Sequence, residues 1–187
     1  FNPASVGNML FRATPLILTG LSVAVAFKTG LFNIGAPGQY LAGTAATLFI
    51  ALGIPTHSVP CWLIWTLAFL GGVAAGALWG MIPGLLKAFF NINEVIACIM
   101  TNWIAANVVT WLFDMSSLKN VVENTKSSYI YSTSYGLTEV DGAMTYVKGA
   151  GVSTPKMGLD IIFPGSQVNG GIIIAILLAI VVCVMLS

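Results

Sequence analysis

The chain has 187 residues, of which 57% are hydrophobic and 7% are charged, and its formal net charge is +1. A soluble domain is about one-quarter charged, so 7 basic and 6 acidic side chains are too few to cover a soluble surface of this size. The near-zero net charge excludes the strongly basic surface of a nucleic-acid-binding protein. A single His and three separated cysteines (Cys61, Cys98 and Cys183) predict neither a metal site nor a disulfide framework. We therefore expect an all-α fold, a polytopic transmembrane helical bundle.

Apolar runs of the length needed to cross a bilayer, about 20 residues, occur five times along the chain. They predict helices over residues 14–32, 35–54, 60–86 and 94–113, and one from residue 169 to the end. Residues 1–113 thus hold four transmembrane helices, with a broken-helix turn at 32–39, and residues 169–187 begin a truncated fifth. Because Phe1 is not an initiator Met and the last run is still apolar at Ser187, we expect a fragment of a longer protein.

The charges gather in one segment, since nine of the thirteen lie between Asp114 and Val168. Lys87, in a short connection without an acid, favours the cytoplasmic side for that connection, and two spans place Lys28 on the same side. The segment 114–168 is then expected to be an extracytoplasmic loop, acting either as a passive connector or as a lid. Residues 127–134 within it predict a short strand or an extended segment outside the membrane.

Glycines recur every four residues in the third predicted helix, at Gly72, Gly76, Gly80 and Gly84. At about 100° per residue they form one stripe, and small residues there allow another helix backbone to approach closely. We expect the stripe to serve helix packing. Pro83, near its end, predicts a bend or the end of the helix.

Polar residues within the predicted spans are the candidate site. Asn93 and Glu94 predict a capped helix start. Asn102, inside the fourth span, is expected either to form an interhelical hydrogen bond or to line a pathway, because polar groups at membrane depth face protein or water.

The stretch 32–39 is the most unusual part of the chain, with two Gly, one Pro, Asn33 and Gln39 between two apolar runs. Irregular backbone is tolerated at membrane depth only where protein or a wet cavity satisfies it, and transporters place such breaks at their substrate sites. A solvated turn at the membrane surface is the alternative. Asn33, Gln39 and Asn102 are our candidate pathway residues, supplying amide groups to a polar, uncharged solute.

The sequence contains no phosphate-binding loop, no zinc-protease motif and no pair of intramembrane acids. We therefore expect a transport subunit rather than an enzyme, with no cofactor on this chain and any ATP hydrolysed on a separate one. A secondary transporter or channel, without an ATPase partner, is the alternative. It should carry coupling-ion carboxylates in the spans, where Glu94 is the one candidate.

Two long motifs resemble a known family. Residues 14–24 with 27–35 form the first, and residues 76–88, continuing through 93–96 and 100–105, form the second. They are similar to the permease subunit of bacterial ABC importers of the nucleoside and simple-sugar type, in the superfamily of the ribose and branched-chain amino-acid permeases. Pro37 stands where that family usually has an acid.

The resemblance implies a permease of about ten spans, of which the helices seen here are the second to the sixth. It also implies a second permease subunit, identical or different, two ATPase subunits and an extracytoplasmic solute-binding protein. The assembly would lie in the bacterial cytoplasmic membrane, move a nucleoside or simple sugar by alternating access, and bind no nucleic acid. The helix that couples such permeases to the ATPase follows the sixth span, beyond Ser187.

Overall fold

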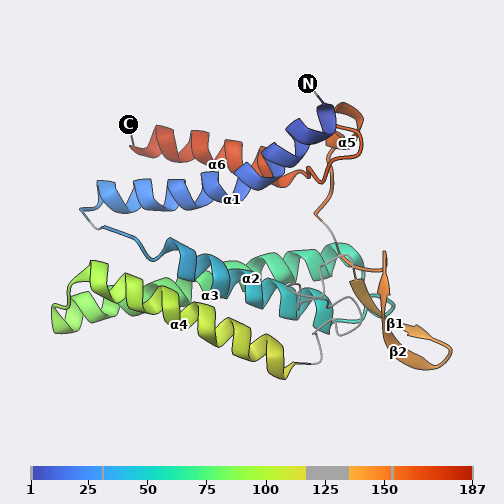
Figure 1. The fold of residues 1–187 in the computed structure, drawn as a ribbon, viewed down its shortest axis with the longest axis horizontal. Coiled ribbons are helices and arrows are strands. Elements are labelled where there is room, and N and C mark those ends of the chain that lie inside the picture. Colours follow the sequence, from blue (N-terminus) through green and yellow to red (C-terminus); the bar gives the residue numbers. More distant parts are fainter. Residues whose placement is uncertain (1, 31, 117–134, 153, 187) are drawn as a thin grey trace. The chain divides into compact units, whose positions relative to one another are not determined.

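A computed structural model describes residues 2–30, 32–116, 135–152 and 154–186. Within those ranges lie six helices and a two-stranded hairpin (Figure 1): α1 (Pro3–Lys28), α2 (Ala36–Gly53), α3 (Cys61–Phe90), α4 (Glu94–Met115), β1 (Tyr135–Val140), β2 (Ala143–Lys148), α5 (Leu159–Ile162) and α6 (Gly171–Leu186). Residues 1–36 and 154–187 form one compact unit, the terminal unit, and residues 37–153 form a second, the central unit. The strand predicted over 127–134 falls outside the described residues.

A helix lies at each of the five positions where the sequence predicts a span. Among the described residues, α1, α3 and α4 are long and apolar enough to cross a membrane. The 18-residue α2 opens with Pro37, Gly38 and Gln39, which lower its hydropathy, and α6 is apolar over 16 residues. Many large apolar side chains of α3 and α4 are exposed, which suits contact with lipid or with other helices.

Several helix boundaries differ from the sequence expectation, among them the end of α1 at Lys28 rather than at residue 32. α1 begins at Pro3 rather than near residue 14, because the Asn2 side chain accepts a hydrogen bond from the backbone of Ala4 and a proline fits the first helical position. α3 continues past Pro83 and ends at Phe90, where Asn91 takes a left-handed conformation. A proline removes one backbone hydrogen bond of the helix. In an apolar setting the neighbouring backbone N–H and C=O groups have no better partners than each other, so the helix continues past Pro83.

In the terminal unit, α1 and α6 pack side by side and run in the same direction (Figure 1). Near their starts, Asn8 Oδ1 accepts a hydrogen bond from the backbone N–H of Gln167 at 2.9 Å. At their ends, Lys28 Nζ donates to the carbonyl oxygen of Leu186 at 2.6 Å. Contacts at both ends fix the parallel arrangement.

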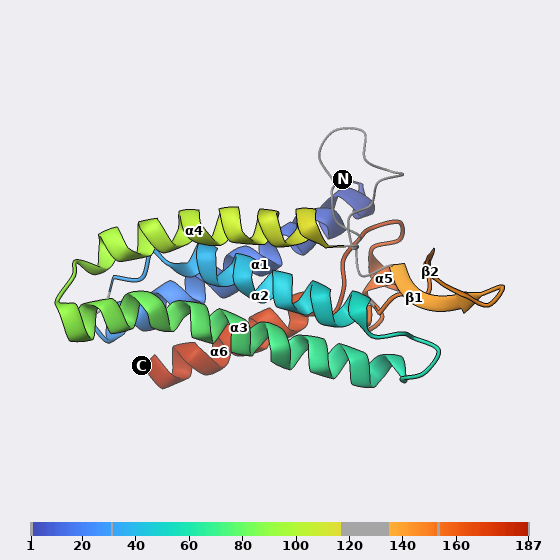
Figure 2. The same cartoon turned by 90° about the horizontal axis from the view of Figure 1, so that it is seen from below.

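In the central unit, α2, α3 and α4 lie beside one another (Figure 2). Its core gathers Ala45, Leu52 and Phe113, and the rings of Phe49 and Phe113 stack with centroids 4.7 Å apart. Thr47 Oγ1 donates to the carbonyl oxygen of Ala68 at 3.2 Å, which ties α2 to α3. Apolar stacking and this hydrogen bond together join all three helices.

The hairpin β1–β2 closes one end of the central unit. Asp141 and Gly142 both have positive φ, the conformation that a tight two-residue hairpin turn requires. The carbonyl oxygen of Leu137 accepts a hydrogen bond from the backbone N–H of Thr56 at 3.0 Å, and Tyr146 packs against the core around Phe113. The expected loop over 114–168 therefore contains an ordered element attached to the α2–α3 connection.

Three glycines of the predicted stripe lie against α2. A Cβ on Gly72 would lie 3.2 Å from the carbonyl oxygen of Gly43, and a Cβ on Gly76 would lie 3.3 Å from that of Gln39. A Cβ on Gly80 would lie 2.8 Å from the amide nitrogen of the Gln39 side chain. Gly84, in contrast, has open space on that side. The close approach of α2 and α3 thus uses the first three positions of the stripe.

We expect Gly76→Leu to destabilise the bundle by about 1–3 kcal/mol, the usual cost of overpacking, because the new side chain would separate α2 from α3. Gly84→Leu is the matched control and should be tolerated. Size-exclusion chromatography and thermal melting of the detergent-solubilised permease would measure both. Equal stability and assembly of the two variants would contradict the packing role of Gly76.

Candidate functional site

The irregular segment between α1 and α2 is shorter than the sequence suggests. Residues 32–35 are not helical, and Asn33 Oδ1 accepts a hydrogen bond from the backbone N–H of Gly35 at 2.9 Å, forming a local turn. α2 begins at Ala36, so Pro37 and Gln39 belong to its first turn rather than to the break expected over 32–39. Proline is accepted there because the first N–H groups of a helix have no partner within it.

One of those N–H groups is satisfied by a different helix. The backbone N–H of Gly38 donates to Asn102 Oδ1, on α4, at 2.9 Å. Asn102 therefore forms an interhelical hydrogen bond, one of the two roles that the sequence leaves open. A Cβ on Gly38 would lie 2.7 Å from the same oxygen, so glycine is needed for this approach.

Polar side chains from α3 and α4 meet at Gly38 of α2. Trp79 Nε1, on α3, lies 3.1 Å from the position that a Gly38 Cβ would take. The next residue is Gly80, where an added Cβ would lie 2.8 Å from Nε2 of the Gln39 carboxamide. We call Gly38, Gln39, Trp79, Gly80 and Asn102 the α2–α3–α4 junction. Within it Asn102 lies against Gly38 and the Gln39 carboxamide lies against Gly80, whereas Asn33 belongs to the other unit.

The junction lies well inside the length of the helices. Asn102 is eight residues after the start of α4, which is about 12 Å along a helix that rises 1.5 Å per residue. The apolar core of a bilayer is about 30 Å thick. If Glu94 marks one edge of that core, Asn102 lies near its middle, where hydrogen-bonding groups need partners from the protein.

Glu94 pairs with Lys87 across the short α3–α4 connection. The Asn93 side chain accepts a hydrogen bond from the backbone of Val95 at 2.9 Å, which confirms the predicted cap. The ion pair was not predicted from the sequence, although the two charges lie seven residues apart on either side of a helix end. It leaves Glu94 a neutralised carboxylate at the end of the span.

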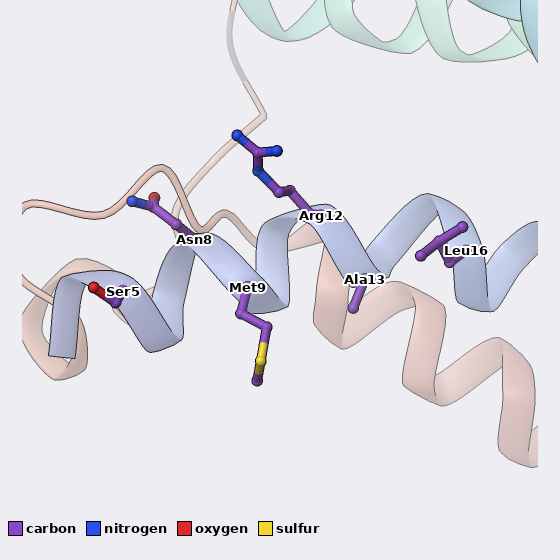
Figure 3. Close-up of a pocket in the computed structure, with 6 residues that line it drawn as sticks. All are labelled: Ser5, Asn8, Met9, Arg12, Ala13 and Leu16. Carbon is purple, nitrogen blue, oxygen red and sulfur yellow. The ribbon is translucent and has the colours of Figure 1, made fainter. Parts of the chain in front are cut away.

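A surface depression of about 510 Å³ lies along the first half of α1 (Figure 3). Ser5, Asn8, Met9, Arg12, Ala13 and Leu16 line it. All six come from one helix, at the spacing of a single face, and Asn8 already accepts a hydrogen bond from Gln167. This depression is an open face of α1 rather than an enclosed site.

The residue that sequence reasoning missed is Trp79. It lies directly before Gly80, one of the stripe glycines, and its sequence position carries no site signal of its own. Its indole Nε1 is nonetheless buried, with no hydrogen-bond partner in the described part of the chain. No pattern in the sequence distinguishes this tryptophan from the four others, because burial of its N–H depends on how three helices meet.

Comparison with known proteins identifies the family. Residues 5–187 match the model of the branched-chain amino acid transport system permease component. The guanosine ABC transporter permease protein NupP of Bacillus subtilis is 45% identical over 107 residues, which is 57% of this chain and 30% of that protein. The nucleoside ABC transporter permease protein NupB of Lactococcus lactis is 34% identical over 184 residues, or 98% of this chain and 46% of that protein.

A third relative is the glucose ABC transporter permease protein TsgB13 of Haloferax volcanii, 40% identical over 105 residues, covering 56% of this chain and 27% of that protein. The chain spans less than half the length of these relatives. No solved structure matches it. Because the family model covers nearly the whole sequence, the chain belongs to the family of branched-chain amino acid transport system permease components, multi-pass proteins of the cytoplasmic membrane.

Proposed function

We propose that this chain is part of the permease subunit of an ATP-driven importer that moves a nucleoside across the cytoplasmic membrane by alternating access. The observation that carries the proposal is its similarity to two nucleoside-type permeases, one of which aligns over 98% of the chain. A simple sugar is the second candidate solute, favoured by the similarity to a glucose permease.

The chemistry of the junction supports an uncharged solute. Gln39 and Asn102 offer carboxamides, which both donate and accept hydrogen bonds and carry no charge. The charged pair Lys87–Glu94 lies at the helix ends and is neutralised within itself. Asn33 uses its side-chain oxygen in a local turn, so its contribution to a solute would come from the amide nitrogen. We retain Asn33, Gln39 and Asn102 as the proposed pathway residues.

The proposal includes partners that this chain does not contain. A second permease subunit would complete the pathway, two ATPase subunits would hydrolyse ATP, and a solute-binding protein would deliver the nucleoside from outside. The permease itself would need no cofactor. Its task would be to hold and release the solute as helices move between two arrangements.

Uptake of radiolabelled guanosine and glucose by the complete transporter in proteoliposomes tests this function. We expect guanosine uptake that requires ATP, the ATPase and the solute-binding protein. Glucose uptake in place of guanosine would select the sugar alternative. Guanosine uptake that proceeds without the ATPase would instead indicate a secondary transporter or channel.

We expect Asn33→Leu and Gln39→Leu each to lower uptake about tenfold, because leucine keeps similar bulk and removes the hydrogen-bonding groups, at a cost of about 1–3 kcal/mol per unpaired group. Asn107→Leu, at an exposed position of α4, is the control and should transport normally. Uptake would be divided by the amount of assembled complex. Wild-type uptake rates in both Asn33→Leu and Gln39→Leu would show that residues 32–39 have only a structural role.

The direction of the helices supports an extracytoplasmic loop. α1 and α6 run the same way within the terminal unit, as they would if three crossings, by α2, α3 and α4, lay between them. Lys28 and Lys87 then fall on one side of the membrane and the segment 114–168 on the other. The positive-inside bias assigns the lysine side to the cytoplasm.

Thr145, exposed on β2, offers a position for testing this topology. In a chain whose three native cysteines are replaced by serine, we expect Thr145→Cys to react with a membrane-impermeant maleimide in intact spheroplasts. The cysteine-free parent chain is the control for background labelling. Reaction only after lysis would reverse the topology.

A further inference from the structure

The indole N–H of Trp79 is a buried hydrogen-bond donor, and the described part of the chain gives it no acceptor. Nearly all buried polar groups in folded proteins have a partner, so one without a partner calls for an explanation. A phenylalanine would supply an aromatic ring at this position without burying an unpaired donor. The contacts of the described residues therefore leave the N–H donor of Trp79 without an assigned role.

The surroundings of this N–H are polar. Trp79 Nε1 and Asn102 Oδ1 lie 3.1 Å and 2.7 Å, respectively, from the point where a Cβ on Gly38 would stand. A donor from α3 and an acceptor from α4 thus border the same spot beside the first turn of α2. In the described arrangement the acceptor is used by the N–H of Gly38.

We propose that Trp79 is a specificity-determining residue of the solute pathway, whose indole N–H donates a hydrogen bond to an oxygen of the transported solute. The inference rests on the import function proposed above. Because Nε1 is buried beside Gly38, an oxygen reaches it only when the first turn of α2 moves away from α3. That movement also frees Asn102 Oδ1, so a donor and an acceptor become available together. Base carbonyls and ribose hydroxyls of a nucleoside are acceptors of the required class.

Trp79→Phe and Trp79→His distinguish the effect of losing the N–H donor from the effect of changing the size of the ring. Phenylalanine keeps an aromatic ring and lacks the donor, whereas histidine restores a ring N–H in a smaller, more polar side chain. The readout is ATP-dependent uptake by the complete transporter, per assembled complex, of guanosine and of four analogues that each lack one oxygen. These probes are 2′-, 3′- and 5′-deoxyguanosine and 2-aminopurine riboside.

We expect the wild-type transporter to import one analogue about tenfold more slowly than guanosine. In Trp79→Phe, guanosine uptake alone should become slower, so that the variant no longer discriminates between guanosine and that analogue. Trp79→His should recover part of that discrimination. Discrimination exerted by the solute-binding protein is unaffected by the substitution, so the change in ratio isolates the Trp79 contact. Trp103→Phe, at a position 68% exposed on α4, is the matched control and should leave the ratio unchanged. If Trp79→Phe does not assemble, Trp79→Met takes its place, since methionine fills irregular spaces.

Unchanged uptake and unchanged discrimination in Trp79→Phe would overturn the proposal, as would a slower variant that histidine does not improve. In the first case the melting temperature should rise, because substitution removes an unpaired buried donor. Import of glucose but not guanosine by the wild type would refute a nucleoside as the solute. The role of Trp79 would then be tested in the same way, by comparing glucose with deoxyglucoses in the wild type and in Trp79→Phe. Import of neither would refute the proposed function, and the role of Trp79 with it.

Discussion

The hydrogen bond from the N–H of Gly38 to Asn102 Oδ1 is the constraint on which the central unit depends. A helix that begins at membrane depth exposes N–H groups that lipid cannot satisfy. Here α4 supplies the acceptor from a carboxamide about 12 Å along its length. The first turn of α2 is therefore held by a partner from within the central unit.

Close packing and hydrogen bonding support one another at this junction. The Gly38 backbone reaches Asn102 because it has no side chain, and Gly76 and Gly80 let α3 approach Gln39. Small residues therefore do more than bring helices together. They hold the carboxamide of Gln39 and the indole of Trp79 next to the start of α2, so a movement of that first turn changes the surroundings of both side chains and of Asn102.

Periodicity and composition in the sequence predict the positions of the spans, the cap at Asn93 and the unusual character of residues 32–39, because these depend on local pattern. The start of α1 at Pro3 and the Asp141–Gly142 hairpin also have local signals, an Asn-Pro cap and an Asp-Gly turn, that the apolar runs overshadow. The partner of Asn102 and the burial of the Trp79 N–H depend on which helices meet, so no single-segment pattern contains them. The Lys87–Glu94 pair depends on how the short α3–α4 connection folds.

Hydrogen–deuterium exchange across the first turn of α2 tests the central constraint most directly. The measurement compares a peptide covering residues 36–41 in the wild-type and Asn102→Ala permeases, both in lipid nanodiscs. If Asn102 Oδ1 holds the N–H of Gly38, its loss should speed exchange in that peptide about tenfold and leave the α3–α4 connection unchanged. Equal exchange in the two proteins would show that the start of α2 is held by something other than Asn102, and would contradict the account.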